Sequence, residues 1–284
     1  MSDNLPFFII FTDLDATLLN KSTYGWKEAL PAINLSKRLS VPVIFASSKT
    51  RAEISLLGSR MSISDPFISE NGGGIFFQER SFPGIPEDAV FDNGLWKLSL
   101  GKPYSLITKT LHEIRDDLGI SIKGFSEMNI EEISSLTGLD QESARLAALR
   151  EYDEPFVIEE KKHIEKDEII KAAEKRGLSI SAGGRFYHLH GKNDKGRAMT
   201  ALMSLYRKIN KNACSIALGD SPNDFPMLKI ADYPVLIRSE NDYSYLKGEI
   251  QSLTITGSSG PKAWNKAVLN ILENPLFLKT DYKT

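Results

Sequence analysis

The sequence predicts an α/β protein in which a doubly wound, parallel-sheet core carries an inserted α+β domain. Residues 6–11 form an unbroken aromatic and β-branched run, which is typical of a buried strand. Helical and strand patterns alternate after this run, and such alternation favours βαβ units. The alternation is interrupted in the middle of the chain and then returns. We therefore predict a core over 1–83, an inserted domain over 84–191 and the rest of the core over 192–284.

In the first part of the core, strand patterns alternate with two helical patterns. Pro31 lies near the first turn of the first helix, where proline is tolerated. Ile54, Leu57 and Met61 share one face of the second helix. The expected strands are 6–11, 41–46, 66–69 and 74–77, and the expected helices are 26–39 and 50–61.

The inserted domain begins with a linker-like stretch rich in proline and glycine, near Pro83 and Pro86. Asn129 and Asp140 are suited to cap two of its helices, and Gly177 to end another. We expect helices over 104–118, 130–137, 141–151 and 164–176, and strands over 156–158, 179–181 and 185–189.

The alternating pattern of the core returns after the inserted domain. The apolar run 214–218 predicts a buried strand between two helical patterns. We expect helices over 195–209, 223–230 and 260–272, and strands over 214–218, 234–237 and 253–255.

Composition excludes several classes of function. The chain has 284 residues, 41% hydrophobic content and a formal net charge of −2, as ordinary globular proteins do. A net charge this small, without a long basic run, argues against bulk binding to nucleic acid. No apolar run approaches the ~18 residues that a membrane span needs. The first residues lack the layout of a signal peptide, so we expect a cytoplasmic protein.

The first strand runs directly into two acids, Asp13 and Asp15. Alternate residues of an extended segment share a face, so we expect both carboxylates on one side. At about 4 Å their repulsion costs on the order of 4 kcal/mol at an effective dielectric near 20. A divalent cation is the usual remedy for such repulsion. The alternative is a polar strand exit that ends in an Asx turn.

Two further groups of polar residues stand at expected junctions between secondary-structure elements. Ser47, Ser48 and Lys49 follow the second core strand, where hydroxyl groups and the free N–H groups of the next helix suit an anion. Lys49 opens a helix, where the macrodipole disfavours a cation, and this mildly indicates an anion nearby. Lys195 also opens a helix, after a glycine-containing loop. Either lysine could instead be simply solvated.

The last group is 219–224, which contains Asp220, Asn223 and Asp224 directly after the strand at 214–218. A capping turn alone would explain one acid and the proline but not two acids and an asparagine. Together the groups contain four acids with about −4 charge, and a phosphate dianion would add about −2. One or two lysines cannot balance this charge. All-oxygen ligation selects Mg²⁺, and the set as a whole suits phosphoryl transfer.

The four groups resemble, in order and spacing, the four motifs of the haloacid dehalogenase (HAD) superfamily of phosphatases. The motifs are 13–17, Ser47, Lys195 and 219–224, and the inserted domain falls where this superfamily has a cap. The resemblance implies a HAD-like core in which Asp13 is the nucleophile and Asp15 the acid and base. It further implies phosphate binding by Ser47, Ser48 and Lys195, and Mg²⁺ held by Asp13, Asp15 through its carbonyl, Asp220 and Asp224.

A narrower resemblance covers nearly the whole chain, through 47–50, 69–74, 150–154, 183–188 and 260–264. These segments are similar to mannosyl-3-phosphoglycerate phosphatases, which release phosphate from a glycosyl-3-phosphoglycerate and leave a glycosylglycerate, a compatible solute. The close alternatives are a glucosyl-3-phosphoglycerate phosphatase or a broader sugar-phosphate phosphatase. A phosphomutase and an inactive phosphosugar-binding protein are further alternatives.

This narrower resemblance also implies residues that bind the phosphorylated glycoside. Arg185 suits the glycerate carboxylate, but His188 lies three positions away and so on the opposite face of a regular strand. Trp264 is more simply explained as packing of the last helix. The candidate substrate-binding residues are Lys49, Asn71, Gly72, Gly73, Arg150, Arg185, His188 and Asn223.

One residue departs from the superfamily pattern, which has glycine where this chain has Ala16. Where such a position needs a positive φ, alanine costs about 1 kcal/mol. Every charged group remains, so Ala16 bears on rate or phosphate fit and not on the class of reaction.

Overall fold

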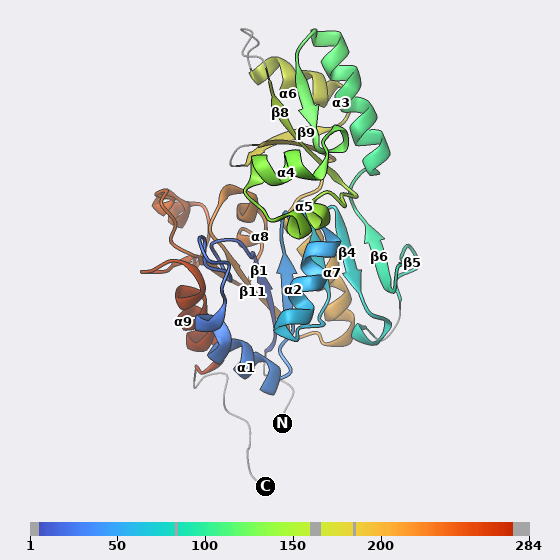
Figure 1. Ribbon diagram of the computed structural model, residues 1–284. Coiled ribbons are helices and arrows are strands. Elements are labelled where there is room, and N and C mark those ends of the chain that lie inside the picture. Colours follow the sequence, from blue (N-terminus) through green and yellow to red (C-terminus); the bar gives the residue numbers. More distant parts are fainter. Residues whose placement is uncertain (1–5, 83–84, 160–165, 184–185, 275–284) are drawn as a thin grey trace.

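The computed structural model describes residues 6–82, 85–159, 166–183 and 186–274. Its core is a nine-stranded sheet of order β13-β12-β11-β1-β2-β3-β4-β6-β5 (Figure 1). Strands β13 to β3 pair in parallel, and β4, β6 and β5 are added antiparallel. The bounds are β1 (Phe7–Thr12), β2 (Val43–Ala46), β3 (Phe67–Ser69), β4 (Gly74–Phe77), β5 (Val90–Asp92), β6 (Leu95–Ser99), β11 (Ala213–Gly219), β12 (Tyr233–Leu236) and β13 (Thr254–Ile255).

Both faces of this sheet are buried, as alternate residues of β1 show. Phe8 and Ile10 belong to one hydrophobic cluster, and Ile9 and Phe11 to the other. This explains the unbroken apolar run of β1 and confirms the predicted doubly wound core. The first cluster is covered by α1 (Leu30–Arg38), α2 (Arg51–Met61) and α9 (Gly260–Leu272), and the second by α7 (Lys195–Ile209) and α8 (Phe225–Leu228).

Trp264 of α9 is fully buried in the first cluster, and its indole N–H donates to Thr12 Oγ1 at 2.9 Å. This confirms its assignment to the core.

The cap is a four-stranded antiparallel sheet of order β7-β8-β10-β9 with helices around it. Figure 1 shows it above the core, with α5 nearest to α2. The predicted α+β character is therefore confirmed. The strands are β7 (Ile122–Gly124), β8 (Asp153–Ile158), β9 (Ser179–Gly183) and β10 (Phe186–His190), and the helices are α3 (Tyr104–Leu118), α4 (Ile130–Thr137), α5 (Gln141–Ala147) and α6 (Lys166–Lys175).

The structure corrects the assignment of β5 and β6, which fall in the range 84–191 that we predicted for the inserted domain. Both strands extend the core sheet beyond β4. Val90 and Phe91 are 61% and 59% exposed. The segment therefore has little of the alternation of apolar and polar residues that predicts a half-buried strand. The overlooked signal is Asn93-Gly94, whose positive φ angles of 49° and 82° suit a tight hairpin turn.

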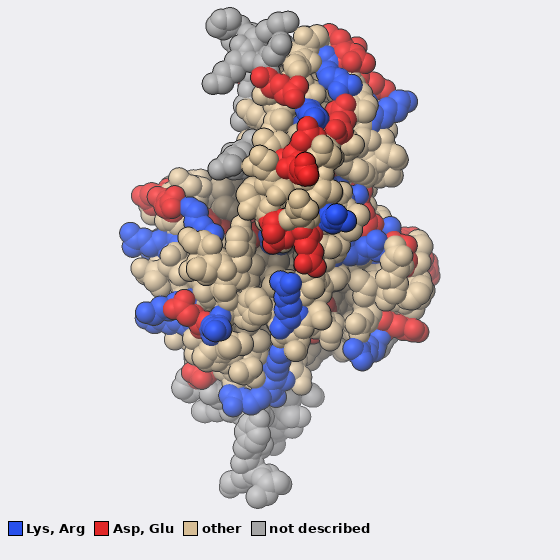
Figure 2. All heavy atoms as spheres, in the orientation of Figure 1, with Lys and Arg blue, Asp and Glu red and all other residues tan. Residues whose placement is uncertain are grey.

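Short 3₁₀ turns complete the described fold: Lys27–Ala29, Glu70–Gly72, Glu79–Ser81, Phe125–Glu127, Pro222–Asp224 and Ser244–Gly248. None of the helices in the described residues is long and apolar enough to cross a membrane. On the face shown in Figure 2, basic and acidic side chains are interspersed over both the core and the cap.

Candidate active site

Three neighbouring parallel strands end at the same edge of the core sheet. Asp13 follows β1, Ser47 follows β2, and Asp220 follows β11. Lys195 opens α7, where the side chain of Asp194 caps the helix. The residues expected to carry the chemistry are thus brought together by the topology, because this is the edge at which open α/β sheets bind ligands.

A buried lysine lies between two of the acids. Lys195 Nζ is 2.6 Å from Asp13 Oδ1 and 2.6 Å from Asp224 Oδ1. Lys195 and Asp224 are completely buried, and Asp13 nearly so. Asp220 joins this group, since Asp13, Asp220 and Asp224 each place a carboxylate oxygen within 4.8 Å of the others. Three acids therefore lie close together, and Lys195 pairs with two of them.

The pKa values reflect this excess of negative charge. Burial raises the pKa of Asp13 to about 8, with Asp224 adding to the effect and Lys195 opposing it. Burial and Asp224 raise the pKa of Asp220 to about 6. Burial by itself would lower the pKa of Lys195, but Asp13 and Asp224 outweigh it and raise that pKa. The oxygen ligands, their burial and the unbalanced charge all fit Mg²⁺.

Asp224 is already held by several donors. Its Oδ2 accepts the backbone N–H groups of Asp220 at 2.9 Å and of Ser221 at 3.1 Å, while its Oδ1 accepts from Lys195. Gly219 is required beside it, because a Cβ there would lie 2.3 Å from the Cβ of Asp224. Asp224 therefore shapes the loop that carries Asp220, whereas Oδ1 of Asp220 accepts from Thr17 at 3.3 Å.

Asp15 has different surroundings from Asp13. Its side chain is 42% exposed, and Oδ2 pairs with Lys49 Nζ at 3.0 Å instead of with Lys195. Burial by itself would lower the pKa of Lys49, but Asp15 and Glu53 outweigh it and raise that pKa. The structure thus leaves Asp15 outside the three-carboxylate group, although we expected it to share a face with Asp13.

Ser47 and Ser48 lie in the turn between β2 and α2. Ser47 is completely buried, and its Oγ accepts the N–H of Lys49 at 3.2 Å. Ser48 is half-buried, and its carbonyl accepts from Arg150 of the cap. Thr50 then starts α2 with a capping box to Glu53. The turn is therefore held in place by local hydrogen bonds and by the cap.

The glycine-rich segment after β3 lies against the same edge. Asn71 Oδ1 accepts from Asn223 Nδ2 at 3.0 Å, which joins two of the predicted substrate-binding residues. Gly72 has φ +93°, and a Cβ there would lie 2.1 Å from the carbonyl oxygen of Asp194. A Cβ on Gly73 would lie 2.3 Å from the Cβ of Tyr152. Glycine is therefore required at both positions, because neighbouring atoms of the protein leave no room for a Cβ atom.

The predicted cap residues are placed differently from one another. Arg150 has a 9% exposed side chain and donates to the carbonyls of Ser48 and Ala147, each at 2.9 Å. The Nδ1 of His188 is 3.0 Å from the buried Asp153. Arg185 lies outside the described residues.

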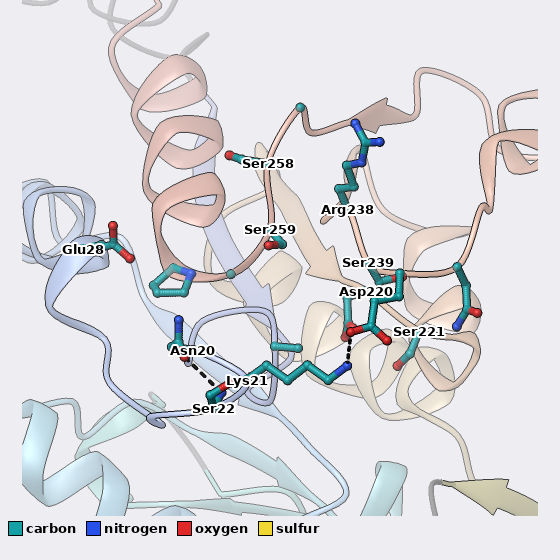
Figure 3. Close-up of a pocket in the computed structure, with 16 residues that line it drawn as sticks. Asn20, Lys21, Ser22, Glu28, Asp220, Ser221, Arg238, Ser239, Ser258 and Ser259 are labelled. Atoms are coloured by element: carbon teal, nitrogen blue, oxygen red, sulfur yellow. Dashed lines mark hydrogen bonds and ion pairs between the residues drawn. The ribbon is translucent and has the colours of Figure 1, made fainter.

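Two grooves border this edge. One of about 640 Å³ lies beside Asp220 and Ala16, and Figure 3 shows the side chains that surround it. The other, of about 390 Å³, lies between the core and cap residues 138–146, and it includes Lys49, Tyr24 and Trp26. The residues labelled in Figure 3 are Asn20, Lys21, Ser22, Glu28, Asp220, Ser221, Arg238, Ser239, Ser258 and Ser259.

Ala16 has a φ of 61°, in the left-handed region where alanine is strained. Ala16 therefore has the positive φ at which alanine costs stability relative to glycine.

Sequence reasoning missed Glu70 and Asp153. Glu70 is completely buried at a φ of +47°, and its carboxyl group accepts backbone N–H groups of the cap. Its position between a serine and Asn71-Gly72 indicated only a turn. Asp153 follows Arg150 by three positions, a spacing that could have suggested an ion pair.

Comparisons with known proteins agree with this arrangement. The sequence model of a family described as haloacid dehalogenase-like hydrolase matches residues 101–244. A Methanococcoides burtonii protein named glucosyl-3-phosphoglycerate/mannosyl-3-phosphoglycerate phosphatase is 41% identical over 93% of this chain and 97% of its own. The mannosyl-3-phosphoglycerate phosphatase of Pyrococcus furiosus is 36% identical over 82% of this chain and 93% of its own.

The fold is shared with solved structures of low sequence identity. The crystal structure of a haloacid dehalogenase-like hydrolase from Bacteroides thetaiotaomicron matches with a TM-score of 0.63 at 16% identity, over 93% of this chain and 99% of its own. The geometry and the sequence relatives lead to one assignment. The chain belongs to the mannosyl-3-phosphoglycerate phosphatase family of the haloacid dehalogenase superfamily, and so to the phosphoric monoester hydrolases.

Proposed function

We propose that the chain is a Mg²⁺-dependent phosphatase that converts mannosyl-3-phosphoglycerate into mannosylglycerate and phosphate through an aspartyl-phosphate. The observation that carries this proposal is the contrast between Asp13 and Asp15. One acid is buried beside a lysine at the end of β1, and the other is 42% exposed beside Lys49. Two acids two positions apart are thereby suited to separate tasks.

In the first half of the reaction, an oxygen of Asp13 attacks phosphorus, and the bond between phosphorus and the glycerate oxygen breaks. Asp15 donates a proton to that leaving oxygen. Lys195 and the turn at Ser47 and Ser48 hold the oxygens of the transferring group. Mg²⁺, held by Asp13, the carbonyl of Asp15 and Asp220 with Asp224 in support, would neutralise the charge that develops on these oxygens.

In the second half, Asp15 takes a proton from water while the water oxygen attacks phosphorus. The bond between phosphorus and Asp13 then breaks, which releases phosphate and regenerates the free carboxylate. The same residue serves as acid and then as base, and the proton that it gives to the leaving oxygen is replaced by the one that it takes from water. The partial exposure of Asp15 supports this role.

The glucosyl analogue is a second candidate substrate, because the M. burtonii relative and another from Persephonella marina, 38% identical, are named for both activities. Mannose and glucose differ at one hydroxyl group. We therefore propose mannosyl-3-phosphoglycerate as the first candidate substrate and the glucosyl compound as the second.

The test is phosphate release from both glycosyl-3-phosphoglycerates and from hexose phosphates, with and without Mg²⁺. The expected result is Mg²⁺-dependent release from the glycosyl esters and a loss on the order of 10⁴-fold or more in Asp13→Asn. Activity that survives Asp13→Asn would contradict the mechanism. A preference for free hexose phosphates would contradict only the proposed substrate.

A further inference from the structure

We infer that Glu70 is a positioning residue: its buried carboxyl group fastens the cap to the loop that carries Ser47 and Lys49. The inference rests on the proposed phosphatase function in one respect, namely that the leaving group is large enough to need the cap. Its physical basis is a set of contacts made by residues 69–73, here called the hub loop.

The backbone of the hub loop is held in an unfavourable conformation. Glu70, Asn71 and Gly72 follow one another in the left-handed region, with φ of 47°, 53° and 93°. Only the glycine adopts this region freely. Strain of this kind persists only where the surroundings impose it. The neighbours of the hub loop show what imposes it.

On the core side, the hub loop is bonded to the phosphate-binding turn. The N–H of Glu70 donates to the carbonyl of Lys49 at 3.0 Å, and the N–H of Asn71 donates to the carbonyl of Ser47 at 2.9 Å. Gly72 lies against the carbonyl of Asp194, directly before Lys195. A displacement of the hub loop would therefore displace both the turn at Ser47 and Lys49 and the residue before Lys195.

The hub loop also contacts the chain where it enters and where it leaves the cap. The carbonyl of Gly73 accepts from the N–H groups of Leu100 at 2.9 Å and Gly101 at 2.8 Å, just before α3. On the return path, Asn193 Nδ2 donates to the carbonyl of Glu70 at 3.3 Å. Both connections between core and cap are thus tied to the same five residues.

The carboxyl group of Glu70 adds a third tie, to the middle of the cap. It accepts the N–H of Glu151 at 3.0 Å and the N–H of Tyr152 at 2.8 Å, immediately before β8. Beside it, Arg150 Nη1 donates to the carbonyl of Ser48 at 2.9 Å. These two hydrogen bonds to the cap are accepted by the side chain of Glu70 and not by the backbone of the hub loop. A substitution of Glu70 can therefore remove them without altering the backbone.

The experiment compares two substrates in Glu70→Ala, Glu70→Gln and the exposed control Glu79→Ala. One substrate is mannosyl-3-phosphoglycerate, and the other is p-nitrophenyl phosphate, which offers the cap neither a sugar nor a carboxylate. We expect Glu70→Ala to lower kcat/KM for the glycosyl ester about 10- to 100-fold, as misplacement of a binding element does, and to leave the small ester nearly unchanged. Glu70→Gln keeps an acceptor oxygen and should restore most of the loss.

Amide hydrogen exchange at Glu151 and Tyr152 tests the tie without any substrate. We expect exchange about tenfold faster or more in Glu70→Ala than in the wild type, with Glu79→Ala unchanged. Equal losses on both substrates, no loss on either, or unchanged exchange at these amides would overturn the inference. If Glu70→Ala does not fold, the same comparison is made with Glu70→Gln, where the expected changes are smaller but of the same sign. A wild type that cleaves only the small ester would refute the proposed substrate, while hydrogen exchange would still decide the role of Glu70.

Discussion

Two buried clusters of charge, one in the core and one where the cap meets it, are built from similar residues and balanced differently. In the core, Asp13, Asp220 and Asp224 lie together, and Lys195 pairs with Asp13 and Asp224. At the boundary, Glu70 accepts two backbone N–H groups, and Asp153 faces both His188 at 3.0 Å and Arg150 at 3.9 Å. The first cluster sets three acids against one lysine, whereas each acid of the second has donors of its own.

The pKa shifts of Asp13 and Asp153 differ in direction because of the charges around each. Burial raises the pKa of Asp13 to about 8 despite the adjacent lysine. Burial also acts on Asp153, but His188 and Arg150 outweigh it and lower its pKa. A site prepared for a cation and a phosphate must carry unbalanced charge when both are absent. Burial raises the pKa of Glu70 to about 8 as well, so the two clusters differ in how their acids are paired with cations and not in every pKa.

The largest expected effect is on stability, from removing the cation of the core cluster. Lys195→Met would remove the cation that pairs with the buried carboxylates of Asp13 and Asp224, and breaking such a buried pair costs about 3–5 kcal/mol. Urea unfolding at neutral pH measures this loss. The matched control is Lys21→Met, since Lys21 and Glu240 pair with side chains 67% and 82% exposed, and the expected change there is about 0–1 kcal/mol. Similar losses in the two variants would contradict the account.

The boundary cluster predicts a pH dependence of stability. Burial raises the pKa of Glu70 from 4.5 to about 8, with Asp153 adding to the effect and Arg150 opposing it. Because the folded-state pKa lies above the unfolded value, the folded protein retains this proton between these limits, and its stability falls as pH rises through them. Relative to Glu70→Gln, the wild type should lose up to about 1.4 kcal/mol per pH unit. Urea unfolding at pH 6 and pH 8 measures the difference, and a constant difference would contradict the shift.

The smallest expected effect concerns Ala16. Its φ of 61° predicts that Ala16→Gly stabilises the protein by about 1 kcal/mol. The control is Ala201→Gly within α7, where glycine should destabilise by about 1 kcal/mol. Thermal unfolding of the two variants should therefore shift in opposite directions. An increase in the phosphatase rate of Ala16→Gly would show that strain at this position also limits turnover.

The core cluster was predictable because each of its members follows a strand or opens a helix. Asp13, Lys195 and Asp220 could be assigned to one edge of the sheet from local patterns alone, since parallel strands bring their carboxyl ends together. The separate surroundings of Asp15 could not be predicted in this way. They depend on Lys49, which reaches it from another loop.

The boundary cluster was not predictable from local patterns. Glu70 looks like a turn residue in the sequence, and its partners at 151–152 lie about eighty positions away, inside an inserted domain. Arg150 was expected to bind substrate, whereas its guanidinium is occupied by carbonyls of Ser48 and Ala147. Local sequence patterns do not show which residues of a cap contact the core. The hairpin of β5 and β6, by contrast, could have been found from Asn93-Gly94.

The most direct test of the comparison is the change in melting temperature that Mg²⁺ causes in the wild type, Asp220→Asn and Glu70→Gln. A ligand that binds only the folded state at about 100 times its Kd adds about 2.7 kcal/mol of stability. We predict a clear rise in melting temperature for the wild type and for Glu70→Gln, and little or none for Asp220→Asn. No rise in the wild type, or an equal rise in all three proteins, would contradict the claim that the unbalanced core cluster is the cation site.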